Sequence, residues 1–330
     1  MIRAPEFWRR DGGLAKLLAP VAWGYGLLGS ARRGLTRPQG AACAVVCIGN
    51  LVAGGAGKTP VALAIGQRLI ERGRAVHFLS RGYGGSAAGP LRVDLGRHDA
   101  GDVGDEPLLL AARAPTWVAR YRPAGAHAAA AAGAEVIVMD DGFQNRSLIK
   151  DLSLLVIDGE YGFGNRRLLP AGPLREPVSG GLARAHGVVV MGDGAAWREC
   201  LAGFAKPILH GALEPTPGSA ALAGQRVLAF AGIARPEKFF ATLQAMGCTL
   251  VGAHAFADHH PYSADEIMTL VEAANAQDAV AVTTEKDHAR MSVEARPMVE
   301  ALRVDVAWRD PAVLDDLLDR LMVSPAAGLA

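Results

Sequence analysis

A glycine-rich loop near the start of the chain carries the residues with the clearest chemistry. Its six positions are Gly54, Gly55, Ala56, Gly57, Lys58 and Thr59. The apolar run 44–48 precedes it and the apolar run 61–65 follows. A strand, a glycine loop and a helix start in this order wrap backbone N–H groups around nucleotide phosphates. Lys58 would reach the β- and γ-phosphates and Thr59 would ligate Mg²⁺, so the loop predicts a nucleoside triphosphate site.

The loop departs from two related patterns, and a third pattern elsewhere in the chain bears on which nucleotide binds. Where the strict phosphate-loop pattern has its first glycine, this chain has Val52, and where partitioning ATPases have a second lysine, it has Ala53. Guanine-specific proteins separate a lysine and an aspartate by one residue, whereas Lys286 directly precedes Asp287. We therefore expect ATP rather than GTP.

Two carboxylates, Asp140 and Asp141, close the apolar run 135–139. An acidic residue at the end of a strand beside a phosphate loop supports Mg²⁺ directly or through water. The alternative is a turn capped by these carboxylates and Gly142. Because a phosphate loop precedes them, we expect the metal role.

Further polar loops follow other apolar runs, at the sheet edge where ligands bind in open α/β folds. They lie at 80–84, 101–107, 168–177, 256–262 and 283–287. Local sequence favours Asp105 as the cap of the next helix. Prolines around Arg175 and Glu176 hold those charges rigidly. The adjacent His259 and His260 cannot chelate zinc from one helix face, which favours acid–base chemistry or hydrogen bonding.

These loops need a parallel sheet to position them, and the apolar runs predict one. Continuous rather than alternating apolar runs indicate strands that are covered on both faces. Such runs lie at 44–48, 75–79, 135–139, 152–157 and 188–191, and an Ala-rich crossover helix is expected at 124–134. The predicted fold class is α/β, a phosphate-loop NTPase-like parallel sheet with helices on both faces.

Length and a change of composition indicate two domains. The chain has 330 residues, of which 50% are hydrophobic and 20% charged, and residues 213–225 turn to Pro, Gly, Ser and Ala, as linkers do. A smaller α/β set follows, with strands expected at 227–230 and 279–282 and helices near 236–246 and 264–276. We expect an N-terminal segment at 1–37, a phosphate-loop core at 38–215 and a second α/β domain at 216–330.

The N-terminal segment carries an uneven charge. Seven basic and two acidic residues give it a local charge of +5, whereas the net charge of the chain is only +1 and gives no case for nucleic acid. Its apolar run, 17–28, is too short to span a membrane, which takes about 20 apolar residues, and it does not resemble a signal peptide. An amphipathic helical segment on an anionic membrane surface and a helix packed on the protein's own core are equal alternatives.

Blocks of the sequence resemble the tetraacyldisaccharide 4′-kinase family of lipid A biosynthesis over nearly the whole chain. In the order of the family, they are Gly49–Leu51 with Gly54–Pro60, Ser80–Gly84, Gly104–Pro107, Asp140–Gln144, Leu169–Glu176, Asp258–His260 and Thr283–Asp287. Val52 is also like this family. The resemblance implies ATP-dependent phosphorylation of the 4′-hydroxyl of a tetraacylated glucosamine disaccharide 1-phosphate at the cytoplasmic face of the bacterial inner membrane.

The resemblance also implies roles for the polar loops. Asp105 would be the catalytic base and would be oriented by a histidine, with His259 preferred to His260 by alignment to the family's Asp-His pair. The catalytic residues would then be Asp105, His259, Lys58 and Arg175, and the Mg²⁺ ligands Thr59, Asp140 or Asp141, and Glu176. Arg175 would neutralise transferred charge. The second domain, which carries His259, is expected to close over the first through the 213–225 linker.

The expected partners are the acylated lipid substrate and an anionic membrane surface, with no nucleic acid and no obligate protein partner. Because such a substrate stays in the membrane, the resemblance favours the N-terminal segment as a peripheral anchor. Two other classes remain as alternatives. One is a GTP-driven metallochaperone, which the four scattered cysteines argue against while fitting a reduced cytosolic setting. The other is a nucleotide-dependent membrane scaffold, which would have no use for Asp105, Arg175 and His259.

Overall fold

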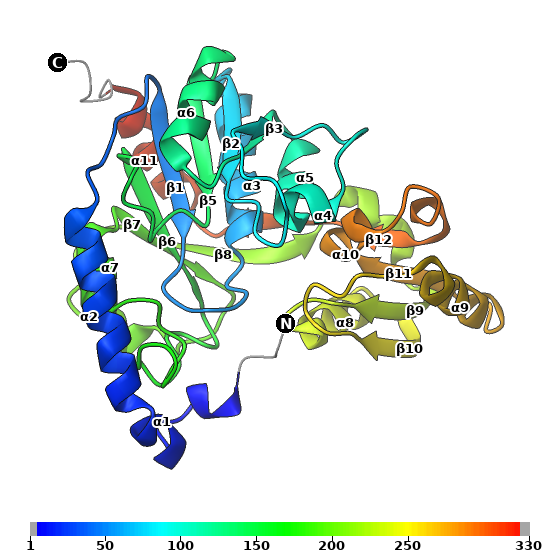
Figure 1. Cartoon of the computed structure of the whole chain (residues 1–330). Helices are drawn as coiled ribbons and strands as arrows, with labels where there is room; N and C mark the ends of the chain where they lie inside the picture. The colour runs from blue at the N-terminus through cyan, green and yellow to red at the C-terminus, as the bar shows by residue number, and fades with distance from the viewer. Residues whose placement is uncertain (1–4, 324–330) are drawn as a thin grey trace.

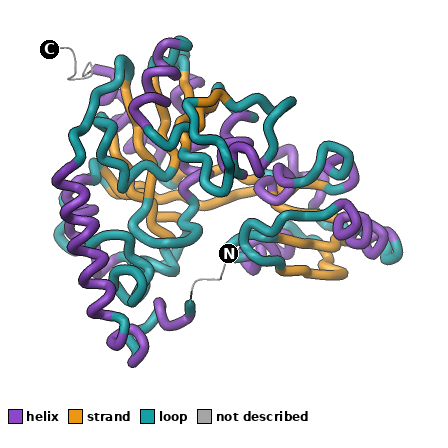
Figure 2. Tube along the Cα trace, in the orientation of Figure 1, coloured by secondary structure: helices purple, strands orange, loops and turns teal. Residues whose placement is uncertain are grey.

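A computed structural model describes residues 5–323 of the chain. Within these residues two sheets form, and helices pack on both (Figure 1). Figure 2 separates the two sheets, with the larger at the left of the view and the smaller at the right.

The larger sheet has nine strands among the described residues. In spatial order they are β13 (Val304–Trp308), β8 (Ile208–Pro215), β7 (Gly187–Met191), β6 (Leu152–Asp158), β1 (Ala44–Gly49), β5 (Val136–Asp140), β2 (Val76–Ser80), β4 (Thr116–Val118) and β3 (Leu91–Arg92). Neighbouring strands are parallel except at the two edges, where β13 pairs antiparallel with β8, and β3 with β4. Strand β1 lies between β6 and β5, so the loop that follows it opens near the middle of the sheet's carboxyl edge.

Strand β1 explains why helices cover both faces of this sheet. Helices α3 (Lys58–Glu71) and α11 (Pro311–Val323) lie on one face, and α6 (Arg122–Ala131) and α7 (Val178–Arg184) on the other. Successive side chains of a strand point to opposite faces. Val46 and Ile48 pack in the cluster that contains α3, whereas Val45 packs with α6 and Cys47 on the side of α7. The predicted α/β class is confirmed.

The smaller sheet has four parallel strands within the described part of the chain. Their order is β10 (Thr249–Ala255), β9 (Arg226–Ala231), β11 (Val280–Thr284) and β12 (Glu300–Leu302). Helices α8 (Pro236–Ala245), α9 (Ala264–Asn275) and α10 (Glu285–Arg290) accompany it. Helix α9 begins with a capping box, in which Ser263 and Glu266 each accept a hydrogen bond from the backbone N–H of the other. The strands and helices predicted for this region are confirmed.

Residues 304–323 return to the larger sheet, which the expected division at residue 216 does not foresee. Strand β13 pairs with β8, and α11 packs on α3, where Arg68 and Arg72 each lie 2.7 Å from Asp315. Leu213, expected in a linker, lies within β8. The smaller sheet is therefore inserted between β8 and β13, and residues 304–323 complete the larger one.

From residue 5 on, the N-terminal segment lies at the rim of the molecule (Figure 1). Its elements are the 3₁₀ turn η1 (Glu6–Trp8), α1 (Gly13–Leu17) and α2 (Ala19–Leu35). Trp8 Nε1 donates to the carbonyl oxygen of Pro170 at 3.0 Å, and the N–H of Asn165 donates to the carbonyl of Trp8 at 2.7 Å. These bonds tie the segment to the loop after β6. Arg3 lies outside the described residues, within which no helix is both long and apolar enough to cross a bilayer.

Candidate functional site

Strand β1 delivers the glycine loop to the carboxyl edge of the larger sheet. Gly54 and Gly57 have φ angles of 119° and 81°, values that glycine adopts without the penalty of a side chain. Helix α3 begins at Lys58, directly after Gly57, so its first N–H groups and the positive end of its dipole face the loop. The strand, loop and helix thus follow one another as predicted.

A second loop braces the first. The N–H of Ala53 donates to the carbonyl of Pro173, and the N–H of Arg175 donates to the carbonyl of Leu51, both at 2.8 Å. These backbone bonds hold the proline-rich loop against the entry to the glycine loop. As a result Arg175 lies beside the end of β5.

The two carboxylates after β5 have different partners. Asp140 Oδ2 accepts a hydrogen bond from Thr59 Oγ1 at 2.8 Å, while Asp141 lies 3.0 Å from Arg175 Nη1 and 3.8 Å from Lys58 Nζ. Burial raises the pKa of Asp140 to about 6. Burial also opposes the charge of Asp141, but Lys58 and Arg175 hold the pKa of that carboxyl below its usual value. The charge of Asp141 is therefore balanced and that of Asp140 is not.

Asp140 is the carboxylate that fits a bound cation. Its Oδ1 atom is buried and has no hydrogen-bond partner in residues 5–323, which is costly for a carboxylate unless a cation satisfies it. Glu176 differs, because Arg184 Nη2 lies 2.8 Å from both of its oxygens and Gln144 donates to it at 3.2 Å. Across the described residues, no three acidic, histidine or cysteine side chains come together as a metal site. Thr59 and Asp140 lie together, whereas Glu176 is already paired.

Asp105 begins α5 (Asp105–Ala111), but it does not cap that helix. The N-cap position is Gly104, with a φ of 87°, and no side chain makes a capping bond there. Asp105 Oδ2 instead lies 2.6 Å from His259 Nδ1, which is 154 positions away in the sequence. The capping expectation is wrong because the carboxylate faces the smaller sheet. The other histidine, His260, lies 3.1 Å from Glu266.

The neighbours of His259 fix its proton. Its Nε2 lies 3.4 Å from Lys286 Nζ, which can only donate. Its Nδ1 faces Asp105, and because a carboxylate can only accept, Nδ1 is the nitrogen that donates there. Although burial opposes the charge of Asp105, the hydrogen bond from His259 and the charge of Arg290 hold the pKa of this carboxyl below its ordinary value. Asp105 is thus ionised at neutral pH and able to accept a proton.

Arg290 is the residue of this site that the sequence analysis missed. Its Nε lies 2.6 Å from Asp105 Oδ2, and its Nη1 lies 2.6 Å from Asp287 Oδ1. Arg290 follows Asp287 by three residues on α10, the spacing at which helical side chains are neighbours. The spacing was the sequence signal that pairs Arg290 with Asp287. Only the packing of α10 on α5 shows that Arg290 also faces Asp105.

More positive charge lies close to the acidic pair. Arg122, the first residue of α6, is buried, and this burial together with nearby Arg81 lowers the pKa of Arg122 to about 10. Arg122 also interacts electrostatically with Asp140 and Asp141. With Lys58, these cations make the edge of the sheet suitable for a polyanion such as a nucleotide.

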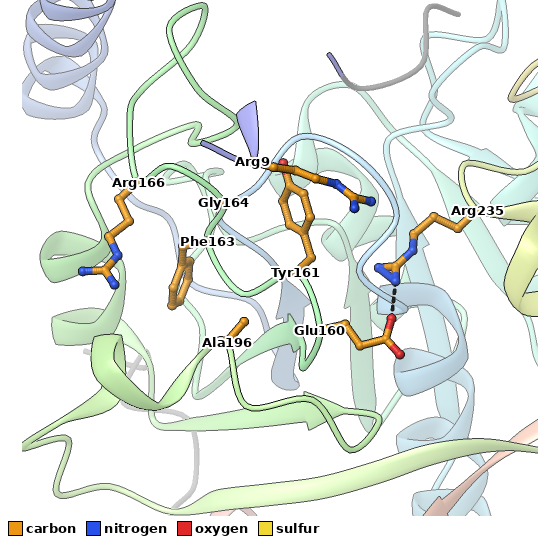
Figure 3. Close-up of a pocket in the computed structure, with 8 residues that line it drawn as sticks. All are labelled: Arg9, Glu160, Tyr161, Phe163, Gly164, Arg166, Ala196 and Arg235. Atoms are coloured by element: carbon orange, nitrogen blue, oxygen red, sulfur yellow. Dashed lines mark hydrogen bonds and ion pairs between the residues drawn. The ribbon is translucent and has the colours of Figure 1, made fainter. Parts of the chain in front are cut away.

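A cavity of about 300 Å³ opens where the N-terminal segment, the loop after β6 and the loop after β9 meet. Figure 3 shows Arg9 beside the ring of Tyr161 and Arg235 directed toward Glu160. The loop that carries Arg235 also carries Gly232, whose carbonyl accepts from Arg290 Nη1 at 2.9 Å. One loop of the smaller sheet therefore borders both the cavity and the Asp105 site.

Comparison with known proteins decides the class of this site. A family model described as tetraacyldisaccharide-1-P 4′-kinase matches residues 14–323. The chain belongs to this family. Members of the tetraacyldisaccharide-1-P 4′-kinase family are phosphotransferases with an alcohol group as acceptor, so the predicted enzyme class is confirmed.

Individual relatives agree with the family model. Proteins named tetraacyldisaccharide 4′-kinase from Paramagnetospirillum magneticum and Rhodospirillum centenum are 51% and 53% identical to this chain, and the alignments cover 98% and 97% of it and 99% and 97% of theirs. A crystal structure of LpxK from Aquifex aeolicus in complex with ATP superposes with a TM-score of 0.73 at 26% identity, covering 93% of this chain and 99% of that one. The kinase family and its fold therefore extend over nearly the whole chain.

Proposed function

We propose that this chain transfers the γ-phosphoryl group of ATP to the 4′-hydroxyl of a tetraacylated glucosamine disaccharide 1-phosphate. The observation that carries the proposal is that a member of this family holds both a phosphate loop and a carboxylate–histidine pair, and that α5, which Asp105 begins, packs on α3, which the loop opens. The glycine loop with Lys58 supplies a phosphate cradle, and the Asp105–His259 pair supplies a base for an alcohol.

The nucleotide half of the site uses groups that are already in position. Gly54–Thr59 and the first turn of α3 bind the phosphates through backbone N–H groups, and Lys58 neutralises charge on the β- and γ-phosphates. Thr59 and Asp140 are the residues that would hold Mg²⁺, because the orphaned oxygen of Asp140 fits a cation. A bound Mg²⁺ would supply charge neutralisation at the phosphates. Arg175, beside Asp141, neutralises further negative charge.

The acceptor half of the site moves one proton. The acceptor oxygen forms a bond to the γ-phosphorus while the bond from that phosphorus to the β–γ bridging oxygen breaks, and the electron pair of the broken bond leaves with ADP. The hydroxyl proton passes to Asp105, which His259 orients through the Nδ1 hydrogen bond. Phosphoryl transfer leaves little covalent work to the protein, so positioning and charge stabilisation dominate.

The N-terminal segment supports a lipid acceptor. Val21, Leu28 and Leu35 recur every seven residues and thus share one stripe of α2, with exposed fractions of 60%, 74% and 85%. Arg9, Arg10 and Lys16 are exposed at the start of the same segment. An apolar stripe with flanking cations suits the surface of an anionic leaflet, where each cation contributes about 1 kcal/mol. We place the protein on the cytoplasmic face of the bacterial inner membrane, where ATP and the acylated acceptor meet.

The proposal is tested by following the label from γ-labelled ATP. The full chain, Mg²⁺ and the tetraacylated disaccharide 1-phosphate in mixed micelles are expected to yield labelled lipid with the new phosphate at the 4′ position. Label that appears only as inorganic phosphate, or at another hydroxyl, would contradict the proposed reaction. Acceptor that already carries a 4′-phosphate is the matched control and should take up no label.

A further inference from the structure

The carboxylate of Asp105 receives two donors on one oxygen. His259 Nδ1 and Arg290 Nε each lie 2.6 Å from Oδ2. Neither of these bonds ends on Oδ1, so Oδ1 is the oxygen that remains for a substrate hydroxyl. The side chains of Arg290 and Asp105 are only 3% and 8% exposed, and their separation therefore depends on packing rather than on surface rearrangement.

Arg290 is itself held in place by a second buried carboxylate. Its Nη1 lies 2.6 Å from Asp287 Oδ1, and the Asp287 side chain is fully buried. Asp287 is anchored by the hydroxyl of Thr284 at 2.6 Å and by that of Tyr262 at 3.2 Å. Because a guanidinium is planar and rigid, fixing Nη1 also fixes the direction of Nε. The orientation of Arg290 toward Asp105 is thus set before any substrate binds.

Gly232 connects the two donors. Its carbonyl oxygen accepts from Arg290 Nη1 at 2.9 Å and from the backbone N–H of His259 at 3.0 Å, while its own N–H donates to Asp287 Oδ1 at 3.0 Å. A Cβ atom at this position would come within 3.1 Å of Asp287 Oδ1 and 3.0 Å of Tyr262 Oη. One backbone unit of the smaller sheet therefore sets where both Arg290 and His259 stand.

We propose that Arg290, oriented by Asp287, is a positioning residue for Asp105, which it holds with Oδ2 engaged and Oδ1 directed to the acceptor hydroxyl. This inference rests on the proposed function, in which Asp105 is the base. Asp105 lies on the side of the larger sheet, whereas both of its donors come from the smaller one. Asp105 therefore has these two hydrogen-bond partners only where the two sheets meet. Arg290 touches neither nucleotide nor acceptor in this account.

Arg290 also keeps the carboxylate charged. The ionisable groups that act on Asp105 are His259 on the loop after β10 and Lys286 and Arg290 on α10. Behind them stand three carboxylates: Asp258 beside His259, Glu106 beside Lys286 and Asp287 beside Arg290. Lys286 lies 2.7 Å from Glu106, so much of its charge is balanced locally. Removing the charge of Arg290 would make the proton harder to remove from Asp105. The acid limb of the activity profile should then move to higher pH.

The test compares variants of the full chain with ATP and the tetraacylated disaccharide 1-phosphate in mixed micelles. Arg290→Gln should lower kcat about tenfold or more while ATP affinity stays within about twofold, because the lost contact acts only on the acceptor's base. Its acid limb should move to higher pH. Arg290→Lys keeps the positive charge but lacks the planar guanidinium. It should recover part of kcat and return the acid limb most of the way to its wild-type pH. Asp287→Asn should move both readouts in the same direction as Arg290→Gln.

Arg113→Gln is the matched control. Arg113 pairs across the same helix contact, with Nη2 3.9 Å from Glu285, but it does not touch Asp105. This variant should keep the wild-type kcat and acid limb. Should Arg290→Gln fold poorly, Arg290→Lys and Asp287→Asn decide through the same readouts.

Failure of the Arg290 role and failure of the proposed function would give different results. An acid limb that stays at the wild-type position in every variant, or a lysine variant no more active than the glutamine variant, would overturn the positioning role of Arg290. Wild-type protein that transfers no label to the lipid would instead overturn the proposed function, whatever the variants do.

Discussion

Arg235 Nη1 lies 2.6 Å from Asp158 Oδ2, so the loop after β9 is bound to the end of β6. Lys238 reaches the same oxygen at 3.2 Å. On the opposite flank of β1, Arg290 binds Asp105. The smaller sheet is therefore attached to the carboxyl edge of the larger one at two places, on either side of the glycine loop.

Arg235→Gln should weaken this attachment. The Asp158 side chain is only 11% exposed. Removing the cation leaves a largely buried carboxylate whose Oδ1 keeps its backbone donors, the N–H groups of Glu160 and Tyr161, but whose Oδ2 keeps only Lys238. We expect the free energy of unfolding to fall by about 1–3 kcal/mol in urea titrations. Arg309→Gln is the control, since the pair of Arg309 with Asp193 is 69% and 86% exposed and should be worth less than about 1 kcal/mol. Equal losses in both variants would argue against the attachment.

Substitutions of the two carboxylates after β5 should differ in how strongly they raise the Mg²⁺ requirement of the reaction. Asp140→Asn removes the negative charge of the carboxylate whose buried oxygen fits the cation, and should raise the Mg²⁺ concentration needed for half-maximal label transfer by about tenfold or more. Asp141→Asn removes the partner of Lys58 and Arg175 and should have the smaller effect on Mg²⁺. A Mg²⁺ titration of both variants distinguishes the roles, and the reverse order would assign the metal to Asp141.

The apolar stripe of α2 should determine membrane binding. Replacing Val21, Leu28 and Leu35 together with serine should abolish co-sedimentation with anionic phospholipid vesicles, while leaving ATP affinity unchanged. Leu213→Ser is the matched control, because Leu213 is a 45% exposed leucine on β8 of the larger sheet. A triple variant that still sediments with vesicles would show that α2 is not the anchor.

Asp105 should stabilise the folded protein, and this contribution should decrease as the pH falls. The pKa of this carboxyl is lowered in the folded protein, so its contribution is fully present above the unfolded value, about 3.9, and is lost as pH falls through the folded value. The difference in unfolding free energy between wild type and Asp105→Asn should therefore shrink as pH falls from about 5 to below about 4. Denaturant titrations at several pH values below about 5 measure it, and a difference that grows on acidification over that range would contradict the lowered pKa of Asp105.

The sequence predicted those parts of the fold that depend on local patterns. The glycine loop and the buried strands follow from composition and order, because the chain forms them from neighbouring residues. Strand β13 was not foreseen, since its antiparallel pairing with β8 depends on residues about ninety positions apart, and a short edge strand has no continuous apolar run. The contact between Asp105 and His259 spans 154 positions, and only the family resemblance pointed to it. Neither the local sequence patterns nor the family resemblance pointed to Arg290.

A single-turnover transfer assay on Asp105→Asn separates a catalytic base from a structural carboxylate. With ATP saturating and the lipid acceptor in excess, we expect this variant to bind ATP with an affinity close to that of the wild type, yet to transfer label to the lipid at least about a hundredfold more slowly. Lys58→Ala, run alongside, should lose ATP affinity as well as transfer. Transfer at the wild-type rate by Asp105→Asn, or a loss of ATP binding equal to that of Lys58→Ala, would contradict the assignment of Asp105 as the base for the acceptor.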